Sequence, residues 1–180
     1  MKVKTYSWDD VHKAATQIAM QMYKDNWRPD YIVGLTRGGL PLSVILSNLT
    51  GIPMHTLGIS FRDTDIGPES NLWMAEDAFG YVYEPDRDDL FGTAKADPEV
   101  CKKILIVDDI NDTGTTFEWI VDDWQSGCLP HHERWGKVWG DNVRFAVMTE
   151  NLSSNFSHVT YYYDEVNKAE QDVWLKYPWE

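Results

Sequence analysis

Two adjacent carboxylates at the end of an apolar run are the residues best placed to do chemistry in this sequence. Ile104 to Val107 is a run of aliphatic residues typical of a strand buried on both faces, and Asp108 and Asp109 follow it directly. In open α/β sheets, ligands bind at the carboxyl ends of the strands. Carboxylates accept hydrogen bonds and repel phosphate, so this pair suits the hydroxyl groups of a sugar.

A turn of small and hydroxylated residues comes after the acids. Thr113, Thr115 and Thr116 supply hydroxyl donors, and Gly114 lets the backbone approach a ligand closely. Apolar residues at helical spacing follow, so the turn opens a helix, whose first amides and dipole favour a phosphate. One segment therefore predicts a sugar-phosphate site, with the acids for the diol and the turn for the phosphate.

The stretch from Ile104 to Thr116 resembles the phosphoribosyl-pyrophosphate signature of type I phosphoribosyltransferases, which is a hydrophobic strand, two acids, two spacers and then Asp-Thr-Gly-x-Thr. The resemblance implies direct displacement at the anomeric carbon, with Asp112 as the general base that takes a proton from a purine ring nitrogen. It also implies Mg²⁺ as the cofactor, bridging the pyrophosphate and the ribose hydroxyls. Asp108 would meet the metal through those hydroxyls or through water.

A second segment, Ile32 to Leu40, looks like the pyrophosphate loop of the same family. There, the glycine amides face the pyrophosphate, the arginine lies nearby, and a cis peptide is expected between Thr36 and Arg37. The residues predicted to bind phosphoribosyl pyrophosphate are Thr36, Arg37, Gly38, Gly39, Asp108, Asp109, Thr113, Gly114, Thr115 and Thr116.

The C-terminal segment from Asp172 to Glu180 resembles the base-binding tail of xanthine–guanine and hypoxanthine–guanine phosphoribosyltransferases. By that resemblance Trp174 stacks on the purine, and backbone groups at Trp174 and Leu175 read its edge. Stacking of a base on an aromatic side chain contributes about 1–3 kcal/mol and tolerates different bases. The alternative for Trp174 is plain packing in a core or interface, the usual place of large aromatic residues.

The base remains open because the sequence departs from the family at one position. Relatives often carry a lysine near the end of the penultimate strand that binds the purine 6-oxo group, and here Glu150 or Asn151 occupies that region. An asparagine can donate a hydrogen bond, whereas an ionised glutamate can only accept one. Two alternatives to a guanine, xanthine or hypoxanthine enzyme remain. One is a phosphoribosyltransferase for a different base, and the other is a non-catalytic regulator that binds phosphoribosyl pyrophosphate.

Buried strands that alternate with helices predict the elements that position these residues. We expect an α/β fold, with a mainly parallel sheet flanked by helices and a small hood formed by the C-terminal segment. Residues 1–180 would form a single domain, with a lid or insert at 61–100 and the base-binding hood at 159–180. The expected helices span about Val11–Met22 (begun by Ser7), Leu40–Leu49 (ended by Gly51) and the residues after Thr116; the expected strands are Tyr31–Leu35, Met54–Ser60, Ile104–Asp109, Val143–Met148 and Val159–Tyr163.

Composition limits the partners. The chain has 180 residues and a net charge of −13, so one domain is expected, and neither nucleic acid nor an anionic membrane finds a basic stripe. The first residues are polar, and Cys101 and Cys128 are the only cysteines, which fits two reduced thiols in a cytoplasmic protein. The expected partners are phosphoribosyl pyrophosphate, a purine base and, by the resemblance, further copies in a homodimer or homotetramer.

Overall fold

The computed structural model describes residues 1–59, 71–84 and 93–180. Of the lid predicted at 61–100, residues 61–70 and 85–92 lie outside the described residues. In chain order the elements are β1 (Lys2–Thr5), α1 (Trp8–Lys24), β2 (Tyr31–Thr36), α2 (Leu40–Thr50), β3 (Met54–Gly58), α3 (Leu72–Phe79), β4 (Tyr81–Glu84), β5 (Thr93–Ala96), β6 (Ile104–Asn111), α4 (Thr115–Gly127), α5 (Trp135–Lys137), the π-helical turn η1 (Val138–Asn142), β7 (Val143–Asn151), β8 (Val159–Val166) and β9 (Val173–Lys176).

The central sheet confirms the predicted fold class. Within the described residues it has five strands in the order β3-β2-β6-β7-β8, and every pairing in it is parallel. The chain moves outward from β2 to β3 and later returns to the other side of β2 with β6. The strand order therefore reverses between β2 and β6, and their carboxyl ends flank the crevice where such sheets bind ligands.

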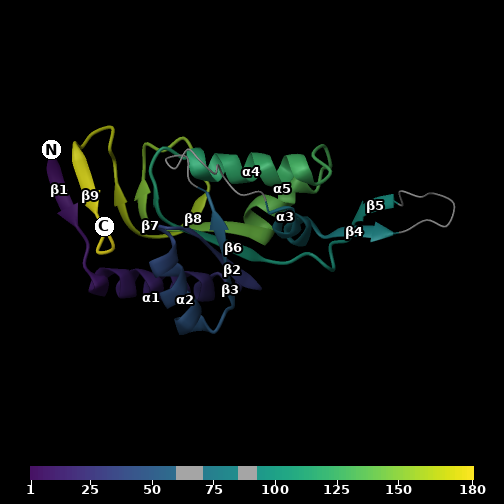
Figure 1. Ribbon diagram of the computed structural model, residues 1–180, viewed down its shortest axis with the longest axis horizontal. Coiled ribbons are helices and arrows are strands. Elements are labelled where there is room, and N and C mark those ends of the chain that lie inside the picture. Colours follow the sequence, from purple (N-terminus) through teal and green to yellow (C-terminus); the bar gives the residue numbers. More distant parts are fainter. Residues whose placement is uncertain (60–70, 85–92) are drawn as a thin grey trace.

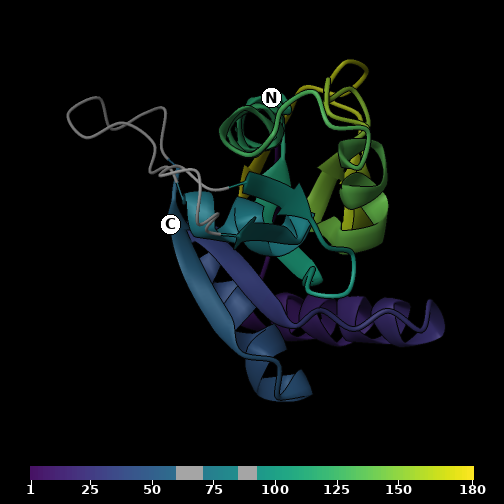
Figure 2. The same cartoon turned by 90° about the vertical axis from the view of Figure 1, so that its right-hand side faces the viewer.

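Helices cover both faces of this sheet, as Figures 1 and 2 show. One apolar cluster joins the sheet to α1 and α2, and a second joins it to α3, α4 and α5. Helix α1 begins after Ser7, as predicted, with a capping box in which the Ser7 side chain accepts from the Asp10 amide and the Asp10 carboxylate accepts from the Ser7 amide. Helix α2 ends at Gly51, whose φ of 70° is the left-handed conformation expected of a C-cap.

The hood takes one strand from each end of the chain. Strands β1 and β9 pair in parallel as a separate two-stranded sheet, whereas β8, which the predicted hood at 159–180 includes, is the edge strand of the central sheet. Tyr6 and Tyr177, which directly follow these two strands, stack with their ring centroids 5.2 Å apart. The hydroxyl groups of both are hydrogen-bonded to Thr149 of β7, which attaches the hood to the central sheet. In Figure 1 the hood lies at one end of the long axis and the β4–β5 hairpin at the other.

Three short helical elements were not predicted from the sequence. Helix α3 lies inside the segment predicted as a lid, and its buried residues, among them Met74 and Phe79, belong to the core. Helix α5 and the turn η1 lie between α4 and β7, where no element was expected, and they bury Trp135 and Val138. These elements are too short for a helical period to appear in the sequence. Over the described ranges, no helix is both long enough and apolar enough to cross a bilayer.

Candidate active site

The predicted pyrophosphate loop lies directly against the two acids. A Cβ atom at Gly38 would come within 2.2 Å of Asp109 Oδ2, and one at Gly39 would come within 2.3 Å of the Val107 carbonyl oxygen. The peptide bond between Thr36 and Arg37 is cis, which confirms the prediction, and the Arg37 side chain is exposed. The loop after β2 and the end of β6 therefore meet so closely that a side chain at Gly39 would collide with backbone atoms.

Asp108 and Asp109 lie side by side at the end of β6, where ionisation of both carboxyl groups is unfavourable. Burial, and then the neighbouring charge of Asp109, raise the pKa of Asp108 well above its usual range. The pKa of Asp109 is also raised, chiefly by burial. Two carboxylates that lose hydration and repel each other are stabilised by hydroxyl donors or by a cation, and a sugar diol with a metal ion supplies both.

The turn predicted to bind phosphate, Thr113–Thr116, depends on the conformation of Gly114 and packs against residues 155 and 156. Gly114 has a φ of 91°, and a Cβ atom there would come within 2.5 Å of the Phe156 nitrogen. The Asn155 amide donates to the Thr113 carbonyl at 3.1 Å, and the hydroxyl oxygens of Thr113 and Thr115 are 2.9 Å apart. The turn leads into α4, whose first amides have no helical partners and point out of the helix end. This geometry suits a phosphate monoester.

Asp112 lies between the turn and two residues from other parts of the chain. Its Oδ1 atom is 2.9 Å from the ammonium nitrogen of Lys168 and accepts a longer hydrogen bond of 3.4 Å from Asn151 Nδ2. The same amide group donates to the Asp112 main-chain carbonyl at 2.9 Å. The Asp112 side chain is 41% exposed, so it is fixed on one side and open to a ligand on the other.

A buried polar cluster that was not predicted from the sequence supports the turn. The Asn111 amide donates to both carboxylate oxygens of Glu150, at 3.0 and 3.2 Å, and to the Phe156 carbonyl at 2.8 Å. The Ser154 hydroxyl donates to Asn111 Oδ1 at 3.0 Å. Burial raises the pKa of Glu150 to about 7. Polar residues at the end of a strand adjacent to β6 were the signal that could have revealed this cluster.

The hood presents Trp174 away from the core. Trp174 is 56% exposed, which excludes plain packing within this chain, whereas its neighbour Leu175 is buried in the cluster beneath. The Lys2 amide donates to the Asp172 carbonyl, and the Tyr6 amide donates to the Lys176 carbonyl. In a parallel pair every second residue of a strand directs its backbone groups toward the partner strand, so the backbone of Trp174 also faces β1. Leu175 therefore offers its backbone groups at the other edge of β9.

The tail also contacts the strand that carries the acids. The Tyr177 hydroxyl donates to the Thr149 hydroxyl oxygen at 3.0 Å and lies 3.4 Å from the Asp109 carbonyl oxygen. Tyr177 is buried, and burial raises its pKa far above the usual range, so it stays a neutral donor. The hood is thus anchored close to the sugar-phosphate segment, which we define as residues 108–116.

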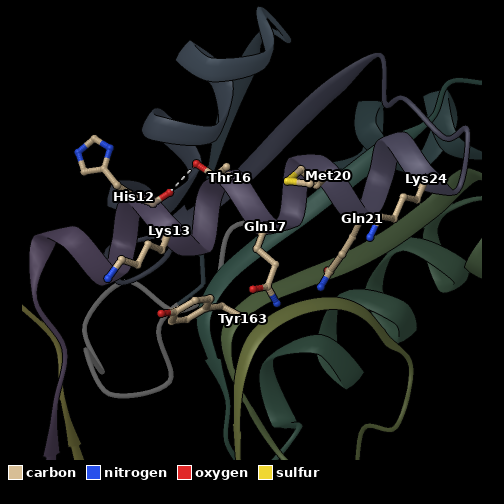
Figure 3. A pocket seen from close by; sticks show the side chains of 8 residues that line it. All are labelled: His12, Lys13, Thr16, Gln17, Met20, Gln21, Lys24 and Tyr163. Carbon is tan, nitrogen blue, oxygen red and sulfur yellow. Dashed lines mark hydrogen bonds between the residues drawn. The ribbon is translucent and has the colours of Figure 1, made fainter.

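A hollow elsewhere on the surface shares no residue with the predicted site. Figure 3 shows its lining, which comes from α1 and from Tyr163 of β8. Beside it, Gln17 and Gln21 donate to the Tyr162 carbonyl. Its lining has amides, hydroxyls and lysines but no carboxylate that could bind a sugar diol or a metal. No group of three or more His, Cys, Asp or Glu side chains that could hold a metal ion occurs within the described residues.

Comparison with known proteins gives consistent matches over almost the whole chain. The family model of the phosphoribosyl transferase domain matches residues 7–173. The hypoxanthine-guanine phosphoribosyltransferase of Schizosaccharomyces pombe is 25% identical over 97% of this chain and 87% of its own length. Xanthine phosphoribosyltransferase 1 of Saccharomyces cerevisiae is 26% identical over 97% of this chain and 88% of its own. The crystal structure of the purine phosphoribosyltransferase of Pyrococcus horikoshii has the same fold, with a TM-score of 0.61, 23% identity, and coverage of 100% of this chain and 95% of that one.

Proposed function

The chain belongs to the phosphoribosyl transferase domain family, and we propose that it transfers ribose 5-phosphate from phosphoribosyl pyrophosphate to a purine base, with release of pyrophosphate, as a cytoplasmic salvage enzyme. The observation that carries the proposal is the sugar-phosphate segment at the point where the strand order reverses. Its acids lie against the glycine loop, and its turn opens α4. Relatives named for hypoxanthine, guanine and xanthine support a purine as the acceptor.

Each part of the site has one task in this reaction. Asp108 and Asp109 accept hydrogen bonds from the ribose hydroxyls, and the amides and hydroxyls of Thr113 to Thr116 hold the 5′-phosphate. The loop from Thr36 to Gly39 receives the pyrophosphate, with Arg37 as its cation. The substrate is thus held at three points, which fixes the anomeric carbon between the leaving group and the base.

The acidic pair fits Mg²⁺. Carboxylate oxygens are the hard ligands that Mg²⁺ prefers, and the raised pKa values of Asp108 and Asp109 indicate a position that a cation would stabilise. Asp108 would hold the ion through the ribose hydroxyls or through water. When bound, Mg²⁺ supplies charge neutralisation for the departing pyrophosphate.

Asp112 and Trp174 serve the base. The open side of the Asp112 carboxylate takes the proton that the purine ring loses as its other ring nitrogen attacks the sugar. Trp174 stacks on the purine, and the backbone of Leu175 meets its edge. Both side chains are half-exposed, as a site for an incoming base requires. A regulator that only binds phosphoribosyl pyrophosphate would need neither of them.

The deciding experiment is a panel of bases. Purified protein is incubated with phosphoribosyl pyrophosphate, Mg²⁺ and guanine, hypoxanthine, xanthine, adenine or orotate, and pyrophosphate release is measured. We expect turnover with at least one purine and none with orotate. Tight binding of phosphoribosyl pyrophosphate without turnover of any base would favour the regulator. Sedimentation of the same sample tests the expected homodimer or homotetramer.

A further inference from the structure

Three buried hydroxyl groups form a continuous series of hydrogen bonds beneath the hood. They belong to Tyr177, Thr149 and Tyr6, which we define as the hydroxyl chain. The Tyr177 hydroxyl donates to Thr149 Oγ1 at 3.0 Å, and the Thr149 hydroxyl donates to the Tyr6 oxygen at 3.0 Å. The Tyr6 hydroxyl then donates to Asp164 Oδ2 at 2.9 Å. The series therefore ends at a carboxylate of β8.

Asp164 determines the direction of the hydroxyl chain. Burial disfavours the ionised form of Asp164, but the Lys4 ammonium and the Tyr6 hydroxyl hold its pKa below the usual value, so it is an acceptor at neutral pH. Burial raises the pKa of Tyr6, which therefore stays a neutral donor. Because each hydroxyl has a single proton and gives it to the next oxygen, removal of one hydroxyl leaves a buried neighbour without its partner.

The hydroxyl chain joins both strands of the hood to the strand that carries the acids. Tyr6 directly follows β1, and Tyr177 directly follows β9. Thr149 lies between their hydroxyl groups and pairs with Ile110 of β6. The Tyr177 oxygen also lies 3.4 Å from the Asp109 carbonyl oxygen. Both ends of the hood thus reach the central sheet at one residue, which is the ladder neighbour of the residue that follows the two acids.

Hydrogen bonds fix the angle of the hood more narrowly than packing does. The hood rests on the core through Leu175 and the rings of Tyr6 and Tyr177, and burial of apolar surface has no preferred direction. A hydrogen bond, in contrast, requires a narrow range of distances and angles. Trp174 lies on β9 three residues before Tyr177, so the angle of the hood determines where Trp174 lies relative to the acids.

We propose that Tyr6 and Thr149 are positioning residues for the transfer reaction, which act through Tyr177 to hold the hood at one angle to the acids. Neither residue touches the substrate. The inference rests on the proposed function and adds a requirement for hydroxyl groups remote from the reacting atoms. In a reaction that depends on alignment, a displacement of about 1 Å can lower the rate about 10²-fold. Tyr6 and Tyr177 lie outside residues 7–173, the part of the chain that the family model matches.

The test removes single hydroxyl groups and keeps the shape of each side chain. Tyr6→Phe and Thr149→Val break the hydroxyl chain, Thr149→Ser retains it, and Tyr23→Phe removes a hydroxyl from an exposed tyrosine of α1. For each protein, the single-turnover rate is measured with Mg²⁺, saturating phosphoribosyl pyrophosphate and the purine that the panel identifies as the best acceptor. Calorimetry measures the affinity for phosphoribosyl pyrophosphate. Tyr6→Phe and Thr149→Val should lower the rate about 10- to 100-fold at unchanged affinity. Thr149→Ser and Tyr23→Phe should retain both.

The double variant Tyr6→Phe/Thr149→Val tests whether the hydroxyl groups act as one unit. Because either substitution breaks the same series of hydrogen bonds, the double variant should be no slower than the slower single variant. Multiplied losses would overturn the inference, since the two residues would then act independently.

Three further results would also overturn the inference while leaving the proposed function intact. One is an unchanged rate in both single variants. Another is a Thr149→Ser protein as slow as Thr149→Val, which would assign the effect to shape. The third is an equal loss of affinity for phosphoribosyl pyrophosphate, which would assign these residues to the fold of the whole site. If the unsubstituted protein turns over no purine, the proposed function fails first and this inference fails with it.

Discussion

The sugar-phosphate segment and the hood contribute to the same site, but the chain builds them differently. The first is nine consecutive residues, 108–116, at the end of a strand inside the sheet. The second joins β1 to β9, the two ends of the chain, and reaches the sheet through the Tyr6–Tyr177 stack and the Tyr177 hydroxyl. A continuous segment keeps its chemistry wherever its strand is buried, whereas the hood depends on contacts between distant residues. Substitutions in the hood can therefore change base binding without disturbing the sugar-phosphate segment.

Asp112 lies where the two regions meet, and its substitution should have the largest effect. Asp112→Asn keeps the shape of the side chain and removes the proton acceptor, so we expect kcat to fall about 10²- to 10⁴-fold. Binding of phosphoribosyl pyrophosphate, measured by calorimetry, should change little because other residues hold the sugar and the phosphates. Loss of that binding together with turnover would mean that Asp112 binds the sugar pyrophosphate and is not specific to proton transfer from the base.

A substitution in the glycine loop, Thr36–Gly39, tests how rigid the binding site for phosphoribosyl pyrophosphate is. In Gly39→Ala the new methyl group would meet the Val107 carbonyl oxygen, which is backbone and cannot rotate away. The loop must shift, so we expect affinity for phosphoribosyl pyrophosphate to fall about 10²-fold and the free energy of unfolding to drop by about 1–3 kcal/mol.

Calorimetry and urea denaturation measure the two effects of Gly39→Ala. Gly136→Ala is the matched control, because a Cβ atom there meets nothing within 4 Å. Equal losses in the two variants would mean that close packing of the loop on β6 does not determine the affinity for the sugar pyrophosphate.

These two regions also differ in how far the sequence predicts them. The run of aliphatic residues before Asp108 and the turn after Asp112 identify a strand, a turn and a helix without any knowledge of distant contacts. The pairing of Asp112 with Lys168 could not be predicted in this way. It requires the ends of β7 and β8 to lie at the same edge as β6, and it requires the turn after β8 to bend back over that edge.

Packing explains the same limit elsewhere in the fold. Helix α3 has four buried residues within eight, so tertiary contacts and not its own periodicity stabilise it. The hood was predicted from its C-terminal half alone, because nothing in Lys2–Thr5 indicates which strand it pairs with. Short segments whose partners are distant in sequence are the ones that local patterns do not identify.

Trp174→Ala should affect the hood without affecting the sugar-phosphate segment. Loss of stacking should raise KM for the purine about 5- to 150-fold, the equivalent of 1–3 kcal/mol, while affinity for phosphoribosyl pyrophosphate stays unchanged. Trp73→Ala is the control, since Trp73 is also half-exposed but packs on Tyr31 and His55 outside the predicted site. Weakening of base and sugar pyrophosphate to the same extent would mean that Trp174 supports the fold.

The smallest effect is expected at Glu150, beneath the phosphate turn. Burial raises its pKa from the ordinary value of 4.5 to about 7, so between these pH values the folded protein binds a proton that the unfolded chain has released. The unfolded state then binds fewer protons, and the free energy of unfolding falls as pH rises through this window. Glu150→Gln cannot titrate, so its stability relative to the unsubstituted protein should increase from pH 5 to pH 8.

We expect a relative gain of about 1–2 kcal/mol, below the full linkage value because water reaches part of the cluster. Urea denaturation of both proteins at pH 5 and pH 8 measures it, with Glu133→Gln as the exposed control. A difference between Glu150→Gln and the unsubstituted protein that does not vary with pH would mean that Glu150 is ionised throughout. In that case the two hydrogen bonds that Asn111 donates to the Glu150 carboxylate would compensate for the burial of Glu150. Glu150 would then give the stability of the sugar-phosphate segment no pH dependence.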